Sequence, residues 1–147
     1  MKKLILALIV LTSSVYSFEK KDDSFTYSTL GTDLIVPSIG MGIRKWGIDG
    51  GYDLNGSFSS LIFINRLAAS ASYLKKFNDN NYIGIGGGAF LALFSYDNQK
   101  YLNGGVFPSL KFGKESENSF HEISIAIPQI SNHGIMFLPL ISYRYGF

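Results

Sequence analysis

The 147-residue sequence contains no cysteine and only two histidines. The absence of cysteine excludes a disulfide framework, a thiol nucleophile, a thiolate metal site and a lipidated N-terminal cysteine. The two histidines and the scattered carboxylates lack metal-ligand spacing, so we expect neither a metal nor another cofactor. No basic patch is present either, which argues against a nucleic-acid partner. Stability must come from the way the chain closes and packs on itself.

The sequence also lacks an apolar run long enough to cross a membrane as a helix. The run Leu4–Leu11 is shorter than the ~20 residues that a spanning helix needs. Lys2 and Lys3 precede it and small, polar residues follow it up to Ser17, which is typical of a secretory signal peptide. We therefore expect a cleaved signal peptide over 1–17 and one exported domain over 18–147. The alternative is that this run is a buried helix or strand of the fold.

Removing the signal peptide removes two lysines and no acidic residue. Of the 13 basic residues in the full sequence, 11 then remain, against 11 acidic ones. We expect the exported domain to be close to neutral.

Apolar residues alternate with small or polar residues along most of the chain from Ser24 onward. Side chains two residues apart share one face of a strand, and no segment combines helical spacing with capping residues. Turn-forming residues separate the strands at regular intervals, as in barrels and sandwiches. The expected strands are about 25–33, 39–46, 52–59, 67–73, 82–94, 102–112, 122–127 and 134–147. The sequence therefore predicts an all-β fold with eight strands.

The two faces of these strands distinguish a membrane barrel from a soluble one. A strand that faces bulk water carries many lysines and glutamates, whereas the polar face here is mostly Gly, Ser, Asn and Ala. Small side chains fit the narrow interior of an eight-stranded barrel. The other face is aliphatic at mid-strand and aromatic toward strand ends, as in interfacial girdles. The aromatic residues are Tyr52, Tyr73, Tyr143, Tyr145 and Phe147. We predict an antiparallel up-and-down transmembrane β-barrel surrounded by outer-membrane lipids.

The last expected strand, Gly134–Phe147, has one face that is apolar throughout and ends in three aromatic residues. That face consists of Ile135, Phe137, Pro139, Ile141, Tyr143, Tyr145 and Phe147. We expect the strand to close the barrel by pairing with the first strand.

Isolated charges on the small-residue face are the best candidates for a functional site. They are Arg44, Asp53, Lys111, Glu122 and Arg144. An unpaired charge in a narrow barrel is costly, so we expect these side chains to form an ion-pair network that plugs the lumen. The alternative role is an ion or proton path through a rearranging network. We favour the plug, because eight strands leave no open channel.

An even number of strands places both termini at the same end of a barrel. If that end faces the periplasm, 47–50, 78–81 and 114–119 are periplasmic turns. The corners at 34–37, 60–65, 95–101 and 129–133 then face outward. These corners are short for a membrane barrel, which disfavours an elaborate adhesin or receptor.

The chain resembles the small eight-stranded outer-membrane barrels of Gram-negative bacteria, of the OmpA transmembrane domain and OmpX type. The resemblance covers the signal peptide and essentially all of the remaining chain. Its most specific motif is Phe147 preceded by Tyr145, Tyr143 and Ile141, which is similar to the assembly signal of such proteins. It implies a monomeric, porin-like component of the bacterial outer membrane. Its partners during biogenesis are the barrel-assembly machinery and periplasmic chaperones.

Two other functions are considered. His121 with Glu122 and Ser124, and His133 with Ser131, suggest a hydrolase, and some small outer-membrane barrels that resemble this chain in size are lipid A deacylases. The His-x-Ser motif of that family is missing, so we do not expect an enzyme. The remaining alternative is a soluble periplasmic barrel that binds a small apolar ligand.

Gly84, Gly86 and Ala89 match a loose G-x-G-x-x-A dinucleotide pattern. The true fingerprint opens a helix after a strand, whereas these residues lie within an expected strand. We expect these glycines to allow curvature or close packing against a bulky neighbour such as Phe107.

Overall fold

The computed structural model describes residues 24–33, 35–96, 99–127, 129–131, 134–136 and 140–147. These residues form ten β-strands in one antiparallel sheet. The strands are β1 Ser24–Asp33, β2 Val36–Trp46, β3 Gly51–Leu61, β4 Ile64–Lys76, β5 Asn81–Tyr96, β6 Gln99–Glu115, β7 Phe120–Ala126, β8 Gln129–Ser131, β9 Gly134–Met136 and β10 Leu140–Gly146. The expected signal peptide lies outside the described residues. Among them, no helix has the length and apolarity needed to span a membrane.

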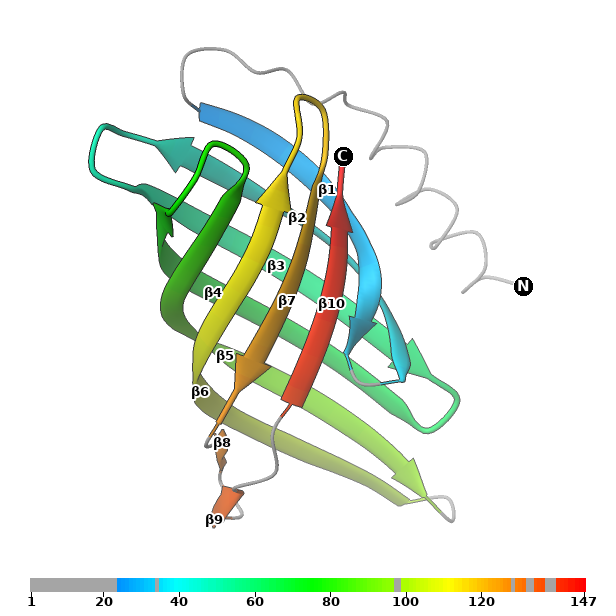
Figure 1. Ribbon diagram of the computed structural model, residues 1–147. Helices are drawn as coiled ribbons and strands as arrows, with labels where there is room; N and C mark the ends of the chain where they lie inside the picture. Colours follow the sequence, from blue (N-terminus) through cyan, green and yellow to red (C-terminus); the bar gives the residue numbers. More distant parts are fainter. Residues whose placement is uncertain (1–23, 34, 97–98, 128, 132–133, 137–139) are drawn as a thin grey trace.

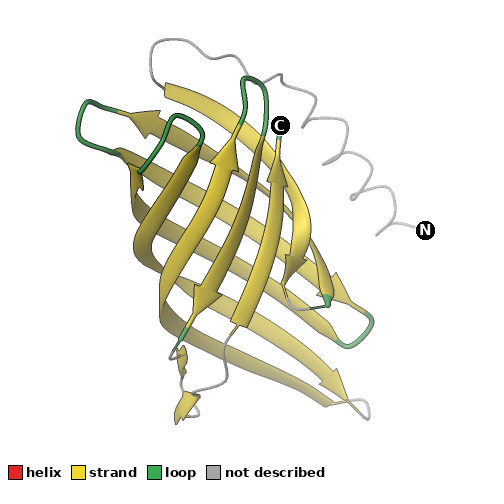
Figure 2. Ribbon diagram, in the orientation of Figure 1, coloured by secondary structure: helices red, strands yellow, loops and turns green. Residues whose placement is uncertain are grey.

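Eight of the ten strands, β1 to β7 and β10, form the wall of a closed barrel. Each wall strand pairs antiparallel with its neighbours, β10 lies between β1 and β7, and the β5–β6 pairing closes the ring. Figure 1 shows the strands tilted relative to the barrel axis, and Figure 2 shows that strands connected by turns make up the described fold. The predicted all-β, eight-stranded, up-and-down barrel is confirmed.

The closing strand is shorter than the sequence indicated. The prediction of one strand over Gly134–Phe147 is wrong, because β9 pairs with β8 and β10 starts only at Leu140. Gly134 has a φ of 120°, a conformation that favours glycine, and turns the chain back from β8 into β9. From Leu140 onward the expectation holds, since β10 pairs with β1 from Ser142 to Gly146.

The other strands extend further into the expected corners. The 60–65 corner is reduced to two turn residues, and the 95–101 loop is largely strand, since β5 runs to Tyr96 and β6 begins at Gln99. Pro37, which we placed at a corner, lies in β2 opposite Thr32. The β2–β3 register begins at Ser38, so Pro37 has no partner residue in β3. The N–H that proline lacks is therefore not needed for a hydrogen bond to β3.

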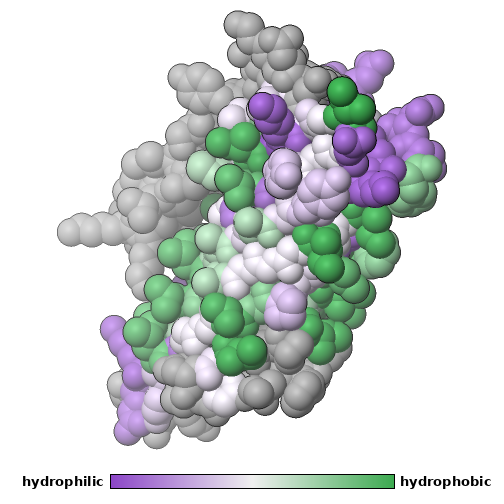
Figure 3. Space-filling view, turned by 90° about the vertical axis from the view of Figure 1, so that its left-hand side faces the viewer, coloured by the Kyte–Doolittle hydropathy of each residue, from purple (hydrophilic) through white to green (hydrophobic). Residues whose placement is uncertain are grey.

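The outer wall is apolar and the inner wall is polar or aromatic. Met41, Leu54 and Ile85 point outward and are 61%, 57% and 64% exposed, whereas their neighbours Arg44 and Asp53 are completely buried. Figure 3 shows apolar residues over the middle of one face and hydrophilic residues toward its two ends. The predicted alternation of strand faces therefore corresponds to the outside and the inside of the barrel.

Two hydrophobic clusters fill the ends of the lumen. At the end that carries the C-terminus, here called the terminal end, six side chains form the first cluster: Phe25, Tyr27, Trp46, Leu74, Tyr82 and Phe120. Toward the opposite end lies the second, made of Ala68, Phe90, Ala92, Phe107 and Ala126. The charged side chains lie between and among these clusters.

Candidate functional site

The five charged residues expected in the lumen lie together in the structure. Arg44 Nε lies 3.0 Å from Asp53 Oδ1, and Arg44 Nη2 lies 2.9 Å from Glu122 Oε2. Lys111 Nζ lies 2.7 Å from Asp53 Oδ2 and 3.6 Å from Glu122 Oε1. Arg144 lies at the edge, with Nη1 4.0 Å from Glu122 Oε1. The members come from β2, β3, β6, β7 and β10, so the barrel must close before the network can form.

Arg44 occupies the centre of this network and is enclosed by aromatic rings. Its guanidinium carbon lies 4.2 Å from the ring centroid of Phe120, 4.7 Å from that of Tyr82 and 5.5 Å from that of Tyr27. Ring faces attract a cation most strongly where water is excluded. The rings therefore offset part of the cost of burying the guanidinium.

Tyrosine hydroxyls and one amide complete the hydrogen bonding. Tyr82 Oη accepts from Arg44 Nη1 and donates to Glu122 Oε2, both at 2.9 Å. Tyr27 Oη donates to Asp53 Oδ1 at 2.7 Å. Asn55 Nδ2 donates to Asp53 Oδ2 at 3.1 Å. Buried charges are tolerated when they are paired and hydrogen-bonded in this way.

Glu115 is a further member that the sequence analysis missed. Its carboxylate accepts from Trp46 Nε1 at 3.0 Å and lies 3.4 Å from Arg44 Nη1, while Lys76 Nζ approaches it at 4.0 Å. Glu115 lies in the expected turn 114–119, but β6 extends through it. Glu115 shares the strand parity of Lys111, which is the signal that could have identified it.

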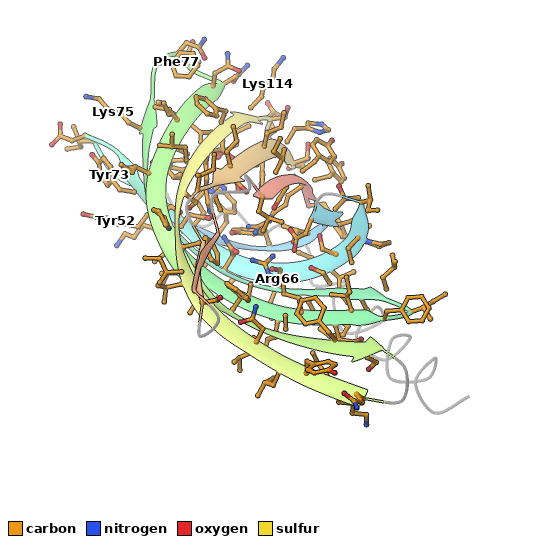
Figure 4. All side chains as sticks on the ribbon, turned by 90° about the horizontal axis from the view of Figure 1, so that it is seen from below. Tyr52, Arg66, Tyr73, Lys75, Phe77 and Lys114 are labelled. Atoms are coloured by element: carbon orange, nitrogen blue, oxygen red, sulfur yellow. The ribbon has the colours of Figure 1, made fainter. Side chains whose placement is uncertain are left out.

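A second, separate ion pair lies nearer the opposite end of the lumen. Arg66 Nη1 lies 2.9 Å from Asp33 Oδ2, and Ser59 Oγ donates to the same oxygen at 2.5 Å. The Arg66 guanidinium carbon lies 5.1 Å from the ring centroid of Phe90 and 5.6 Å from that of Phe107. Figure 4 shows Arg66 inside the barrel. The expected strand 67–73 begins after Arg66, whereas β4 begins at Ile64 and includes it.

Together these side chains plug the lumen. Arg44, Asp53, Lys111 and Glu122 are each 2% exposed or less. The bulky groups stand in the middle of the barrel, where an open channel would have to pass. The arrangement holds charge inside the barrel and connects strands that are not neighbours in the sheet.

Of the residues considered for hydrolysis, His121 is not brought together with Glu122 and Ser124. His121 points outward and its Nδ1 lies 2.7 Å from Tyr143 Oη, whereas Glu122 and Ser124 point into the lumen. Side chains on successive residues of a strand point to opposite faces, which separates the histidine from the carboxylate. His133 lies outside the described residues. The described residues also contain no cluster of histidine and acidic side chains that could hold a metal ion.

The expected aromatic girdle residues all lie on the outer wall. Tyr52 and Tyr73 pack against each other with ring centroids 5.5 Å apart, and Figure 4 shows them outside the ring of strands. Tyr145 stacks on Phe147 with centroids 5.9 Å apart.

The glycines of the loose dinucleotide pattern lie within β5. A Cβ on Gly84 would lie 2.5 Å from a methyl group of Leu74, and one on Gly86 would lie 2.1 Å from the Ala71 carbonyl oxygen. Phe107 packs instead against Gly88, where a Cβ would meet its ring at 2.8 Å. The glycines therefore permit close packing, as expected, but the contact with Phe107 belongs to a neighbouring glycine.

No protein-family model matches the chain, and no curated protein gives a significant match to it. Function must therefore be inferred from the geometry of the barrel.

Proposed function

We propose that this chain is an integral protein of the bacterial outer membrane, of the OmpA transmembrane domain and OmpX type. In this role it is a structural membrane component with a side-chain-filled lumen and no enzymatic activity. The observation that carries the proposal is the polarity of the wall, with ion pairs buried inside and aliphatic side chains exposed outside. A barrel in water has the reverse arrangement.

The exposed apolar band fits a hydrocarbon environment. Contiguous apolar surface of this kind makes a water-soluble protein prone to association. In a bilayer the same surface faces lipid tails, and a closed barrel leaves no unpaired strand edge along its wall. The outward-facing rings of Tyr52, Tyr73 and Tyr145 suit the interface between tails and headgroups. Outer-membrane lipids are thus the proposed immediate partners of the folded monomer.

Export and assembly complete the proposal. A cleaved signal peptide over 1–17 takes the chain across the inner membrane, and periplasmic chaperones then hold it. The terminal residues Ile141, Tyr143, Tyr145 and Phe147 present the assembly signal to the barrel-assembly machinery. In the folded barrel these four side chains face outward, which leaves them accessible from the lipid side.

The geometry supports this role over the two alternatives. A lipid-acting enzyme needs a nucleophile, a base and an acid on one side of the wall, whereas His121 and Glu122 lie on opposite sides. A soluble carrier needs an apolar cavity inside the barrel, whereas the lumen here holds paired charges. A hollow of about 870 Å³ lined in part by Met41 and Leu54 lies on the outer wall instead.

Substituting one outward-facing residue tests the proposal. Met41 lies at the middle of β2 and is 61% exposed, so Met41→Arg is nearly neutral if water surrounds the barrel. If lipid surrounds it, the charge destabilises the folded barrel by about 2–4 kcal/mol. The unfolding free energy in lipid vesicles measures the difference. Ile48→Arg, in the exposed 47–50 turn, is the control and should be neutral in both cases.

Localisation is tested on the same proteins. We expect the unmodified chain in the outer-membrane fraction, with a gel migration that changes on boiling as the barrel unfolds. Recovery in the soluble fraction, with migration unaffected by boiling, would contradict the proposal. Unaltered lipid A in a strain that overproduces the chain would agree with a non-enzymatic role, and deacylated lipid A would overturn it.

A further inference from the structure

The outward-facing side of the described strands carries lysines but no carboxylate. Lys45, Lys75 and Lys114 are exposed. The acidic residues within the described strands are instead buried in the lumen: Asp33, Asp53, Glu115 and Glu122. The other described acidic residues lie in the turns between strands. The outer wall therefore offers positive charge to an anionic ligand.

Lys114 on β6 lies beside His121 on the outer wall. The two residues are directly opposite each other in the β6–β7 ladder, and both are exposed. Side chains in such positions share one face of the sheet, with Cβ atoms about 4.5–5.5 Å apart. Both residues line a hollow of about 290 Å³, together with Phe77, Phe112 and Tyr143. Figure 4 shows Lys114 and Phe77 outside the ring of strands, so a ligand outside the barrel can contact Lys114 and His121 together.

Lys114 and His121 have hydrogen-bond donors that the described residues do not use. No ion pair in the described part of the chain includes Lys114. His121 is held at one nitrogen, Nδ1, which lies 2.7 Å from Tyr143 Oη. If the imidazole is neutral and accepts this bond, its proton is on Nε2, and if it is protonated, both nitrogens carry a proton. In both states Nε2 is a donor beside the flexible ammonium group of Lys114.

The polarity of the wall changes along these strands in the same order as the polarity of a phospholipid. Two residues closer to the middle of the barrel than Lys114, Phe112 lies opposite Ile123. Two residues further, Leu110 lies opposite Ile125. The outer face thus passes from charged to aliphatic over four residues, which is about 13 Å along a strand. A headgroup bound at Lys114 would have its acyl chains against apolar side chains.

We propose that Lys114 and His121 bind the phosphate of a phospholipid whose headgroup is negatively charged. Lys114 Nζ and His121 Nε2 donate to the phosphate oxygens, and the acyl chains lie over Phe112 and Ile123. A zwitterionic phospholipid carries its own cation, which competes with the lysine, and a free phosphate lacks the chains that contact the wall. The site requires lipid outside the barrel, so it rests on the proposed function.

Lipid retention by the folded barrel tests the proposal. The barrel is refolded in detergent micelles that contain equal amounts of phosphatidylglycerol, which is anionic, and phosphatidylcholine, which is zwitterionic. Native mass spectrometry then counts the lipids that stay bound, and we expect preferential retention of phosphatidylglycerol. Equal retention of the two lipids would overturn the proposal. Displacement of phosphatidylglycerol by inorganic phosphate would also overturn it, because the site would then bind a free anion.

Four variants locate the bound lipid. Lys114→Gln should weaken phosphatidylglycerol binding about fivefold, which is the contribution of one lysine near an anionic lipid surface. Lys114→Arg keeps the charge and should retain the lipid. His121→Phe keeps a ring against Tyr145, whose centroid lies 5.0 Å away, but removes both nitrogens and should also weaken binding.

Lys45→Gln is the matched control, because Lys45 is an exposed lysine outside the lining of the hollow. It should retain phosphatidylglycerol as the unmodified chain does. Equal retention by Lys114→Gln and Lys45→Gln, or full retention by His121→Phe, would contradict the assigned site.

Fractionation of cells separates failure of this site from failure of the proposed function. Recovery of the chain in the outer-membrane fraction, without a lipid preference in micelles, would refute the site and leave the membrane role intact. Recovery in the soluble fraction would refute both.

Discussion

Arg44 Nη2 donates to Glu122 Oε2 over 2.9 Å and joins β2 to β7 across the lumen. These strands are not neighbours in the sheet, since β1 and β10 separate them. The contact therefore depends on closure of the whole barrel and not only on the pairing of two strands.

Removing the Glu122 carboxylate should strongly destabilise the barrel. Glu122→Leu leaves Arg44, Lys111 and Arg144 with one carboxylate fewer inside the lumen. Breaking a buried ion pair by removing one partner costs about 3–5 kcal/mol. The urea unfolding midpoint measures the loss. Glu117→Gln, in the exposed 116–119 turn, is the control and should leave the midpoint unchanged.

The same variant tests whether the network acts as a plug or as an ion path. We expect the unmodified barrel to show no wide-pore conductance in planar bilayers, because the charges fill its centre. Glu122→Leu should lower stability whether or not it alters conductance. An unchanged unfolding midpoint would remove the plug hypothesis. If the unmodified barrel conducts ions, and Glu122→Leu abolishes that conductance without lowering stability, the result would favour the ion path.

The Tyr82 hydroxyl should contribute to stability through its two hydrogen bonds. Tyr82→Phe keeps the ring over Arg44 but removes the oxygen that lies 2.9 Å from both Arg44 Nη1 and Glu122 Oε2. Hydrogen bonds to charged groups contribute about 1.5–3 kcal/mol, and we expect a loss in that range. Tyr52→Phe, on the outer wall, provides the comparison. Equal urea midpoints for the two variants would contradict the assigned role of the hydroxyl.

The barrel itself could be predicted from the sequence because strand alternation is a local signal. Each expected strand overlaps an observed one, and Ile141 and Tyr143 of the predicted apolar face point outward. The strand ends were less accurate because polar or turn-forming residues can continue a ladder when a neighbour pairs with them. The pairing of β9 with β8 depends on a contact between two short segments, which strand alternation does not predict.

The lumen was predicted only in part, for a related reason. Arg44, Asp53 and Glu122 stood out because they interrupt a face of small residues. Glu115 and Arg66 lie just outside the expected strands, so the alternation pattern does not assign them to a face. The buried ring of Tyr82 differs from the small residues that make up most of the inner face.

Glycines inside the barrel make room for these rings, which yields a further prediction. A Cβ on Gly113 would lie 2.1 Å from the Tyr82 ring, and the ring is held by Arg44 and Glu122. Gly113→Ala must displace the ring, and overpacking typically costs about 1–3 kcal/mol. Gly56→Ala, where the nearest atom would lie 3.9 Å away, is the matched control. Equal unfolding free energies would show that the ring can move freely.

Phe147 extends the pairing of β10 with β1, here called the seam of the barrel, and it belongs to the proposed assembly signal. Two variants separate these two roles. The backbones of Phe147 and Ser28 form two hydrogen bonds. Ser28 N donates to Phe147 O at 2.9 Å, and Phe147 N donates to Ser28 O at 3.0 Å. Deleting Phe147 removes both bonds and the ring, whereas Phe147→Ala removes only the ring. If the ring is the assembly signal, both variants should reduce the heat-modifiable protein in the outer membrane.

Refolding in detergent micelles, without the assembly machinery, isolates the contribution of the seam. There Phe147→Ala should fold with nearly unchanged stability, and the deletion should lose about 1–3 kcal/mol from two backbone bonds. Normal membrane assembly of both variants would refute the assembly signal while leaving the seam intact. A large stability loss for Phe147→Ala in micelles would instead show that the ring stabilises the folded barrel directly, through its stacking on Tyr145.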